Sequence, residues 1–329
     1  MARRGSVALL LASLLLRSEA GRAESGRGER LAQASSVRVT TNYFPTWSPD
    51  GRSLAFESEV DGKWRIARTE EDGTGFRWLT EGEGNSRVPS WSPDGQRLAF
   101  VSDRGGMWDL YVMAADGSGT SAITRDEARE WSPRWSPEGD RIAYRRDSGG
   151  RREIFTSRTD GSTPFRVTSD AVDLDGRIAW APDGRIAFFA TRPGERQGEG
   201  APALLWTVRA DGTELRAVTQ EPRREFNPSW APDGSKLAFD AHREGGWESD
   251  DGGWEVWLRN ADGTHPRKLT DNAVNDWAPA WSPDGTRIAY CSGMNDRYEI
   301  WVMDANGSNA RRVTHLVYEG LAPGEKPKN

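Results

Sequence analysis

The sequence predicts an all-β protein, a six-bladed β-propeller whose blades are four-stranded antiparallel sheets. A five-residue motif, Trp-(Ser/Ala)-Pro-(Asp/Glu)-Gly, occurs six times, at spacings of 44, 44, 45, 50 and 51 residues. Each copy is followed by the same order of short apolar segments and glycine-containing turns. The 36 Gly and 18 Pro among 329 residues favour many tight turns over long helices.

The motif itself predicts the end of one strand and the turn into the next. Its proline presets the backbone of the turn, its acidic residue bonds to nearby backbone, and its glycine accepts a positive φ. The motif tryptophans are expected to be structural core residues: Trp47, Trp91, Trp135, Trp180, Trp230 and Trp281. A positive φ is expected at the motif glycines: Gly51, Gly95, Gly139, Gly184, Gly234 and Gly285.

Three more strands follow each motif, for example residues 98–100, residues 109–113 and the pair Ile123-Thr124. Four short antiparallel strands repeated six times are typical of a propeller, whose radial closure leaves only short edges. A linear stack of the units is the alternative. Residues 37–40 and 313–314 both carry the fourth-strand pattern, so either end of the chain is a candidate for completing the blade where the termini meet.

At these motifs the chain resembles the WD40-like propeller repeat of the TolB family. The resemblance covers about residues 37–315, and it implies the propeller fold. The same repeat builds the propellers of tricorn and prolyl-oligopeptidase-type peptidases. TolB carries an additional N-terminal α/β domain and the peptidases carry a catalytic domain. Here we expect neither, because a short linker precedes the repeats and only a short tail follows them.

The N-terminus has the pattern of an export signal. Arg3 and Arg4 precede an apolar run at residues 7–16, which is too short to span a bilayer. The expected signal peptide is residues 1–20, with a second candidate cleavage site after Ala23. A linker (21–36), the propeller (37–315) and a C-terminal tail (316–329) complete the predicted organisation. We therefore expect an exported protein, periplasmic or extracellular, with no membrane span in the mature chain; a buried N-terminal helix is the alternative.

Composition argues against several classes of function. The net charge of −6 disfavours a nucleic-acid-binding protein. The single cysteine, Cys291, excludes an intramolecular disulfide, and the three histidines are scattered along the chain. The Gly-x-Ser-x-Gly, His-Glu-x-x-His and Gly-x-x-x-x-Gly-Lys-(Ser/Thr) motifs are absent. The sequence thus favours a binding protein, with no catalytic residues, cofactor or metal, over an enzyme.

The candidate binding site lies where the fourth strand of one blade leads into the first strand of the next. We expect these connections at one mouth of the central channel and the motif turns at the opposite face. Five residues before each motif Trp stands a polar residue: Asn42, Ser86, Glu130, Asp175, Glu225 or Asp276. The following position is mostly aromatic: Tyr43, Arg87, Trp131, Gly176, Phe226 or Trp277.

A ring of carboxylates beside aromatic faces suits a basic or extended peptide, a cation or sugar hydroxyls. We therefore expect a protein or peptide partner at this mouth, with a cation as a further ligand. The alternative is that these residues cap the first strand and pack between blades. Two other functions stay open. One is a carbohydrate-active or other hydrolytic propeller using a carboxylate pair such as Glu225 and Asp276, and the other is a structural module of an envelope assembly.

Two long loops break the regularity of the repeat. Residues 191–203 lengthen blade 4 and residues 241–253 lengthen blade 5. Since these blades are neighbours, we expect one raised lobe on the face of the candidate site, where length variation favours binding. Glu248, Asp250 and Asp251 lack the spacing of a calcium loop and are expected to be a solvated charge run.

Overall fold

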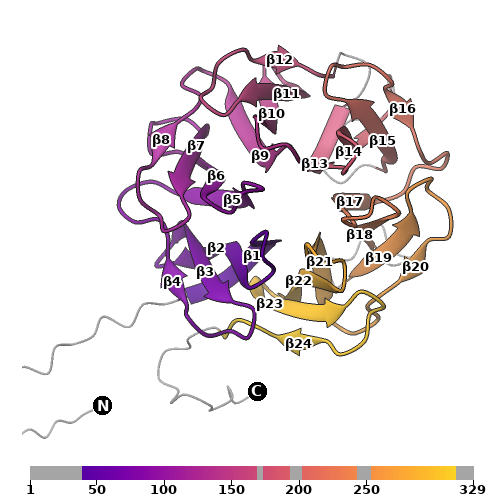
Figure 1. Ribbon diagram of the computed structural model, residues 1–329. Coiled ribbons are helices and arrows are strands. Elements are labelled where there is room, and N and C mark those ends of the chain that lie inside the picture. Colours follow the sequence, from indigo (N-terminus) through magenta and orange to yellow (C-terminus); the bar gives the residue numbers. More distant parts are fainter. Residues whose placement is uncertain (1–38, 169–172, 193–201, 243–252, 316–329) are drawn as a thin grey trace, which may run out of the picture. The chain divides into compact units, whose positions relative to one another are not determined.

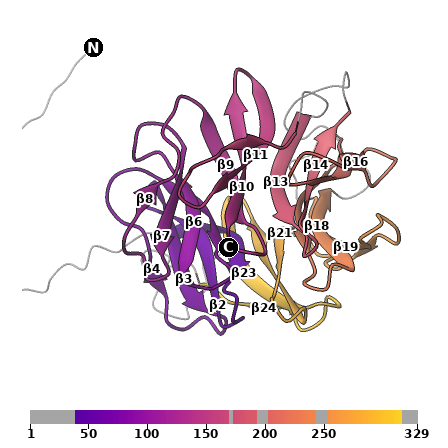
Figure 2. The same cartoon turned by 45° about the horizontal axis from the view of Figure 1, so that its top comes forward.

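Six separate four-stranded antiparallel sheets are arranged as blades around a common centre in the computed structural model (Figure 1). The structure describes residues 39–168, 173–192, 202–242 and 253–315. Every secondary-structure element in these ranges is a strand. The predicted six-bladed propeller is therefore confirmed, and the blades stay distinct when the ring is tilted (Figure 2).

Each blade uses four strands that are consecutive in the sequence. Blade 1 holds β1 (Val39–Trp47), β2 (Ser53–Val60), β3 (Lys63–Glu70) and β4 (Arg77–Trp78). Blade 2 holds β5 (Ser86–Trp91), β6 (Arg97–Ser102), β7 (Asp109–Ala114) and β8 (Ser121–Ala122). Blade 3 holds β9 (Arg129–Trp135), β10 (Arg141–Ser148), β11 (Arg151–Arg158) and β12 (Phe165–Arg166).

The second half of the ring repeats this order. Blade 4 holds β13 (Asp173–Trp180), β14 (Arg185–Thr191), β15 (Leu204–Arg209) and β16 (Arg216–Ala217). Blade 5 holds β17 (Glu225–Trp230), β18 (Lys236–His242), β19 (Trp254–Asn260) and β20 (Arg267–Lys268). Blade 6 holds β21 (Asn275–Trp281), β22 (Arg287–Met294), β23 (Arg297–Asp304) and β24 (Arg311–Arg312). The first strand of every blade lies nearest the centre (Figure 1).

The motif turns have the predicted chemistry. In blade 1 the Gly51 amide donates to the Ser48 carbonyl at 2.9 Å, and the Arg52 amide donates to Asp50 Oδ1 at 3.1 Å. All six motif glycines have a positive φ, between 69° and 80°. A side chain at this φ is strained, which explains why glycine stands there in each repeat.

The hydrophobic core is divided among the interfaces between neighbouring blades. One buried cluster combines Ile66 and Leu79 of blade 1 with Trp91 and Phe100 of blade 2, and five further clusters of the described residues are built in the same way. Four motif tryptophans are buried and two, Trp180 and Trp281, are half-buried within such clusters. The predicted structural role of the motif tryptophans agrees with this packing.

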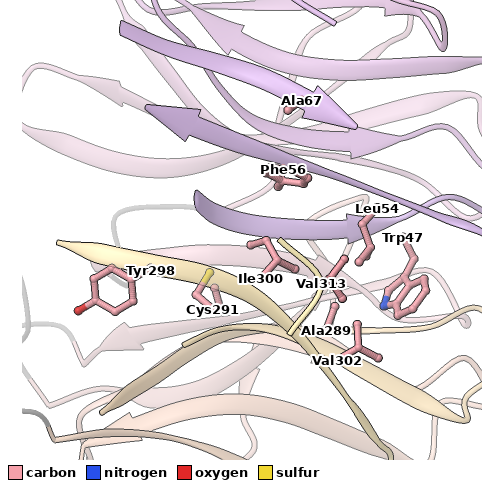
Figure 3. Packing of buried hydrophobic residues seen from close by; sticks show 11 residues of the cluster. Trp47, Leu54, Phe56, Ala67, Ala289, Cys291, Tyr298, Ile300, Val302 and Val313 are labelled. Carbon is pink, nitrogen blue, oxygen red and sulfur yellow. The ribbon is translucent and has the colours of Figure 1, made fainter. Parts of the chain in front are cut away.

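Blade 6 and blade 1 meet where the ring closes, and each of them is built from its own four consecutive strands in the described part of the chain. Residues 39–40 belong to the inner strand β1, whereas Val313 continues the outer edge of blade 6 through a bond from its amide to the Ile300 carbonyl at 2.8 Å. Trp47 and Leu54 of blade 1 pack with Ile300 and Val313 of blade 6 in one buried cluster (Figure 3). Side-chain packing therefore holds this seam.

Several sequence expectations fall outside the described residues. These are the signal peptide, the linker, the C-terminal tail, the acidic run at Glu248, Asp250 and Asp251, and most of the two long loops. Within the described ranges, no helix is long and apolar enough to cross a membrane.

Truncation of a motif tryptophan should cost far more stability than truncation of an exposed aromatic residue. Trp135 is 5% exposed and Phe165 is 44% exposed. We expect Trp135→Ala to lower the free energy of unfolding by about 3–5 kcal/mol, because it removes buried apolar surface and leaves a cavity. Phe165→Ala should change it by about 0.5 kcal/mol or less. Urea unfolding followed by circular dichroism measures both, and equal losses would contradict the assignment of the core to the blade interfaces.

Candidate functional site

A bulge in each inner strand shapes the centre of the propeller. The strand register shifts in blade 1 between Tyr43 and Thr46, and Phe44 takes a φ of 54°. The equivalent residues before proline also have positive φ values: Val88, Ser132, Asn227 and Ala278. A bulge redirects side chains along a strand. Here it separates residues such as Tyr43, which contact neighbouring aromatic rings, from residues such as Thr46, which line a central cavity.

The polar residues expected to ring the mouth are buried. Their exposed fractions are at most 4%: Asn42, Ser86, Glu130, Glu225 and Asp276. The side chain of Asp175 lies outside the part that the structure describes. The expectation of an open ring of carboxylates is therefore corrected for the residues described, because these side chains point into the protein.

Two of these buried groups bond to threonines that follow the outer strands. The Thr124 hydroxyl of blade 2 donates to Glu130 Oε2 of blade 3 at 2.9 Å, and Asn42 Nδ2 of blade 1 donates to Thr314 Oγ1 of blade 6 at 3.2 Å. The same threonine hydroxyls accept a backbone N–H from the third strand in every blade: Thr80, Thr124, Thr168, Thr219, Thr270 and Thr314. The arrangement matches the alternative of capping and packing between blades.

Burial also changes the charge of these carboxyl groups. It raises the pKa of Glu130 to about 7, although Thr124 and Arg146 oppose the shift. Burial likewise raises the pKa values of Glu225 and Asp276 above their usual range. Arg259 offsets part of this effect at Glu225, since its Nη2 lies 2.5 Å from Glu225 Oε1. Glu130 is therefore only partly ionised at neutral pH, and Glu225 is paired with a buried arginine.

Aromatic side chains occupy the mouth instead. Tyr43 stacks on Trp64 with ring centroids 5.2 Å apart, and its ring lies 4.9 Å from that of Trp277. Further along, the rings of Trp131 and Trp108 are 4.8 Å apart. We call the half-buried set that runs over blades 6, 1, 2 and 3 the aromatic arc: Trp277, Tyr43, Trp64, Arg87, Trp131 and Trp108. The aromatic part of the predicted site is thus brought together for these blades.

Arg87 joins the two halves of the arc. Its guanidinium carbon lies 4.2 Å from the ring centroid of Trp64 and 6.0 Å from that of Trp131. Buried Glu57 fixes it, because Arg87 Nε and Nη2 both donate to Glu57 Oε1, at 3.1 and 2.6 Å. The pair is formally neutral, so Arg87 acts in the arc as a flat stacking surface.

Sequence reasoning missed the aromatic residues that begin the third strands. Trp64, Trp108 and Tyr298 each follow the motif Trp of their own blade at the same sequence spacing. Trp254 follows its motif Trp at a longer spacing, because blade 5 has the long loop. Trp254 contacts Phe226 of the predicted site, with ring centroids 5.4 Å apart. The constant spacing is a signal that would have identified Trp64, Trp108 and Tyr298.

A cation bound at this mouth is the remaining expectation. In the ranges that the structure describes, no group of three or more His, Cys, Asp and Glu side chains is placed to hold a metal ion. The cation expected at the mouth therefore stays an untested prediction.

Comparison with known proteins agrees with the repeat and the fold. The family described as "TolB beta propeller domain" matches residues 27–212 and 216–324. The chain belongs to this family. The Tol-Pal system protein TolB of Anaeromyxobacter dehalogenans is 32% identical over 104 residues, which are 31% of this chain and 20% of that protein. The chain thus spans about one fifth of that relative.

Two solved structures resemble this TolB-type propeller in fold. The putative TolB from Agrobacterium tumefaciens has a TM-score of 0.61 and 21% identity, with 80% of this chain and 90% of that chain covered. An oligogalacturonate lyase in complex with manganese has a TM-score of 0.58 and 19% identity, with 86% and 81% covered. At such identities the likeness establishes the fold alone.

The raised pKa of Glu130 predicts a pH-dependent stability. An unfolded glutamate has a pKa near 4.5 and folded Glu130 has one of about 7. Between these values the folded state binds more protons, so Glu130 lowers the stability of the fold as pH rises from about 4.5 to 7. Glu130→Gln lacks this titration. We expect the free energy of unfolding of Glu130→Gln, relative to that of the natural protein, to increase by about 1–3 kcal/mol as pH rises from about 4.5 to about 7. Above about pH 7 this difference should stay constant.

Chemical unfolding of both proteins from pH 4 to pH 9 measures this difference directly. Buried Asp240, whose pKa is also raised to about 7, is present in both proteins, so its contribution cancels. A difference that does not vary with pH would show that Glu130 titrates normally.

Proposed function

We propose that this propeller is an exported scaffold that binds an extended peptide segment of a protein partner along the aromatic arc. The observation that carries the proposal is the continuity of the arc. Half-buried rings from four consecutive blades contact one another, in series through Arg87, at one mouth of the channel. The connections from the fourth strand of one blade to the first strand of the next lie at the same mouth.

The chemistry of the arc suits a peptide in extended form. Flat aromatic faces stack on proline and aliphatic side chains, and they attract Lys and Arg through cation–π contacts. Proline-rich segments in particular dock on aromatic-lined surfaces, because they lose little conformational entropy on binding. Since Glu57 neutralises Arg87, attraction to basic side chains is expected to come from the rings rather than from a ring of carboxylates.

Family membership supports a scaffold of this kind. The relative described above is named as a protein of the Tol-Pal system, and assembly with a protein partner is proposed here by analogy. Export to the periplasm or the cell exterior is part of the same proposal, based on the charged and apolar pattern of residues 1–20.

A carbohydrate ligand is the second candidate. Aromatic rings stack on sugar faces as readily as on proline, and the fold is shared with an oligogalacturonate lyase. A structural role within an envelope assembly would instead leave the arc in permanent contact with another protein.

Binding of blocked peptides tests the proposal. The probe is a peptide of alternating proline and lysine with both ends blocked, titrated by calorimetry into the natural protein. Trp64→Ala and Trp131→Ala each remove one stacking face, so we expect at least tenfold weaker binding, in line with the loss of an aromatic anchor. The control is Phe76→Ala, which removes an aromatic side chain that is 48% exposed next to the outer strand of blade 1.

The outcome separates the candidates. The partner would lie on the other face if peptide binding survives both tryptophan substitutions. The same conclusion would follow if the peptide protects amides at the motif turns from hydrogen exchange. Maltohexaose binding that depends on Trp64 and Trp131, with no peptide binding, would favour the carbohydrate ligand.

A further inference from the structure

The central cavity lies in the channel, on the side of the bulge that faces the motif turns. Its volume is about 240 Å³. Motif tryptophans and the prolines beside them form much of its wall, including Trp47, Trp230 and Pro228. Two arginines, Arg134 of blade 3 and Arg177 of blade 4, also line it. Two positively charged side chains in one cavity call for an explanation, because a buried charge is costly unless it is paired.

Arg177 is the more deeply placed of the two. Its exposed fraction is 7%, and its guanidinium carbon lies 4.3 Å from the ring centroid of Phe44 in blade 1, the blade diametrically opposite in a ring of six. Within the described part of the chain, neither Nε nor Nη2 of Arg177 has a hydrogen-bond partner. Burial lowers its pKa to about 10, so the side chain is still charged at neutral pH. It presents two donors that the protein leaves unused.

The two carboxyl groups whose charges act on Arg177, Glu57 and Asp240, bond to other donors. Glu57 accepts from Arg87 and from the Val88 amide, the latter at 2.8 Å. Asp240 Oδ1 accepts from Asn227 Nδ2 and from the Ala278 amide, both at 2.9 Å. Burial raises the pKa of Asp240 to about 7, which weakens its negative charge at neutral pH. These groups attract Arg177 at a distance, but neither forms an ion pair with it.

Arg134 adds a second donor group on the same wall. Its Nη1 donates to the Pro133 carbonyl at 2.8 Å, which orients the side chain without neutralising it. Burial and the charge of Arg177 both push its pKa below the usual range. Each arginine thus disfavours the charge of the other, and an anion between them would relieve both.

We infer that the central cavity binds a carboxylate, held by Arg177 and Arg134 and enclosed by the motif tryptophans and prolines. The guanidinium fork matches the two oxygens of a carboxylate, and the tryptophan and proline side chains of the lining suit the hydrocarbon that such a group carries. The two unpartnered donors of Arg177 suit the two oxygens of a carboxylate better than the four oxygens of a sulfate or phosphate. The carboxylate belongs either to a small free organic acid or to the C-terminus of a peptide. This site lies beyond the aromatic arc and does not depend on the function proposed for it.

Small ligands of matched shape test the inference. Propionate carries the carboxylate, propionamide is its neutral counterpart and sulfate is an anion of different shape. Each is titrated into the full chain at constant ionic strength, and binding is followed by calorimetry and by the rise in Tm that binding produces through mass action. We expect propionate to bind and to raise Tm, and propionamide and sulfate to bind at least tenfold more weakly.

Three variants assign the effect to the cavity. Arg177→Gln and Arg134→Gln should each weaken propionate binding at least tenfold and abolish its effect on Tm. Arg77→Gln removes an exposed arginine from the outer strand of blade 1 and should leave both unchanged. If one cavity variant fails to fold, the other carries the same test. Propionate binding that is equal in the natural protein and in the folded cavity variants would overturn the inference, as would sulfate binding as tightly as propionate.

A pair of peptides then identifies the source of the carboxylate. N-acetyl-dialanine with a free C-terminus should bind like propionate if a peptide end is the ligand, whereas its C-terminal amide should not. Binding of propionate but of neither peptide would assign the site to free organic acids. Binding of the free and the amidated peptide with equal affinity, unaffected by Arg177→Gln, would contradict a carboxylate site.

Discussion

The packing of each blade on its neighbour is the constraint on which the rest of this propeller depends. Every blade consists of four consecutive strands, and among the strands that the structure describes none crosses from one end of the chain to close the ring. The seam between blades 6 and 1 therefore relies on the contacts used at the other interfaces. A motif Trp packs on the preceding blade there, as shown by the bond from Trp47 Nε1 to the Ala280 carbonyl at 3.1 Å. A buried polar residue also bonds a threonine across the same boundary.

This constraint explains which features of the fold the sequence could predict. A turn or a core position that every blade needs must recur at a fixed spacing, so the six motif glycines and tryptophans identify the blades directly. The same argument explains the misplaced carboxylates. Asn42, Glu130 and Asp276 recur because each blade boundary needs a buried hydrogen-bonding group, and a polar residue alone does not reveal whether it faces water. Along a regular strand, successive side chains point to opposite faces of the sheet, so sequence position predicts the face. The bulge before the motif breaks this alternation between Tyr43 and Thr46.

The aromatic arc was only half predictable for a related reason. Tyr43, Trp131 and Trp277 stand beside the motif and were found from its spacing. Their partner Trp64 lies on the third strand of blade 1 and Trp108 directly precedes the third strand of blade 2. Only the antiparallel pairing of each blade brings them to the same mouth. Their spacing from the motif Trp is regular. The spacing alone does not place them at the mouth, because that requires knowing which end of the third strand faces it.

Departure from the repeat is the clearest guide to function in a protein whose scaffold is repeated. At the position just before the motif Trp the blades carry Thr46, Ser90, Arg134, Ala179, Ser229 and Ala280. Two residues earlier they carry Phe44, Val88, Ser132, Arg177, Asn227 and Ala278. One arginine stands in each series, in adjacent blades, and both line the same cavity. Blade packing needs neither of them, since the other blades pack with smaller or uncharged residues. A charge that the scaffold does not require, buried at a cost in stability, is best explained by a ligand that needs it.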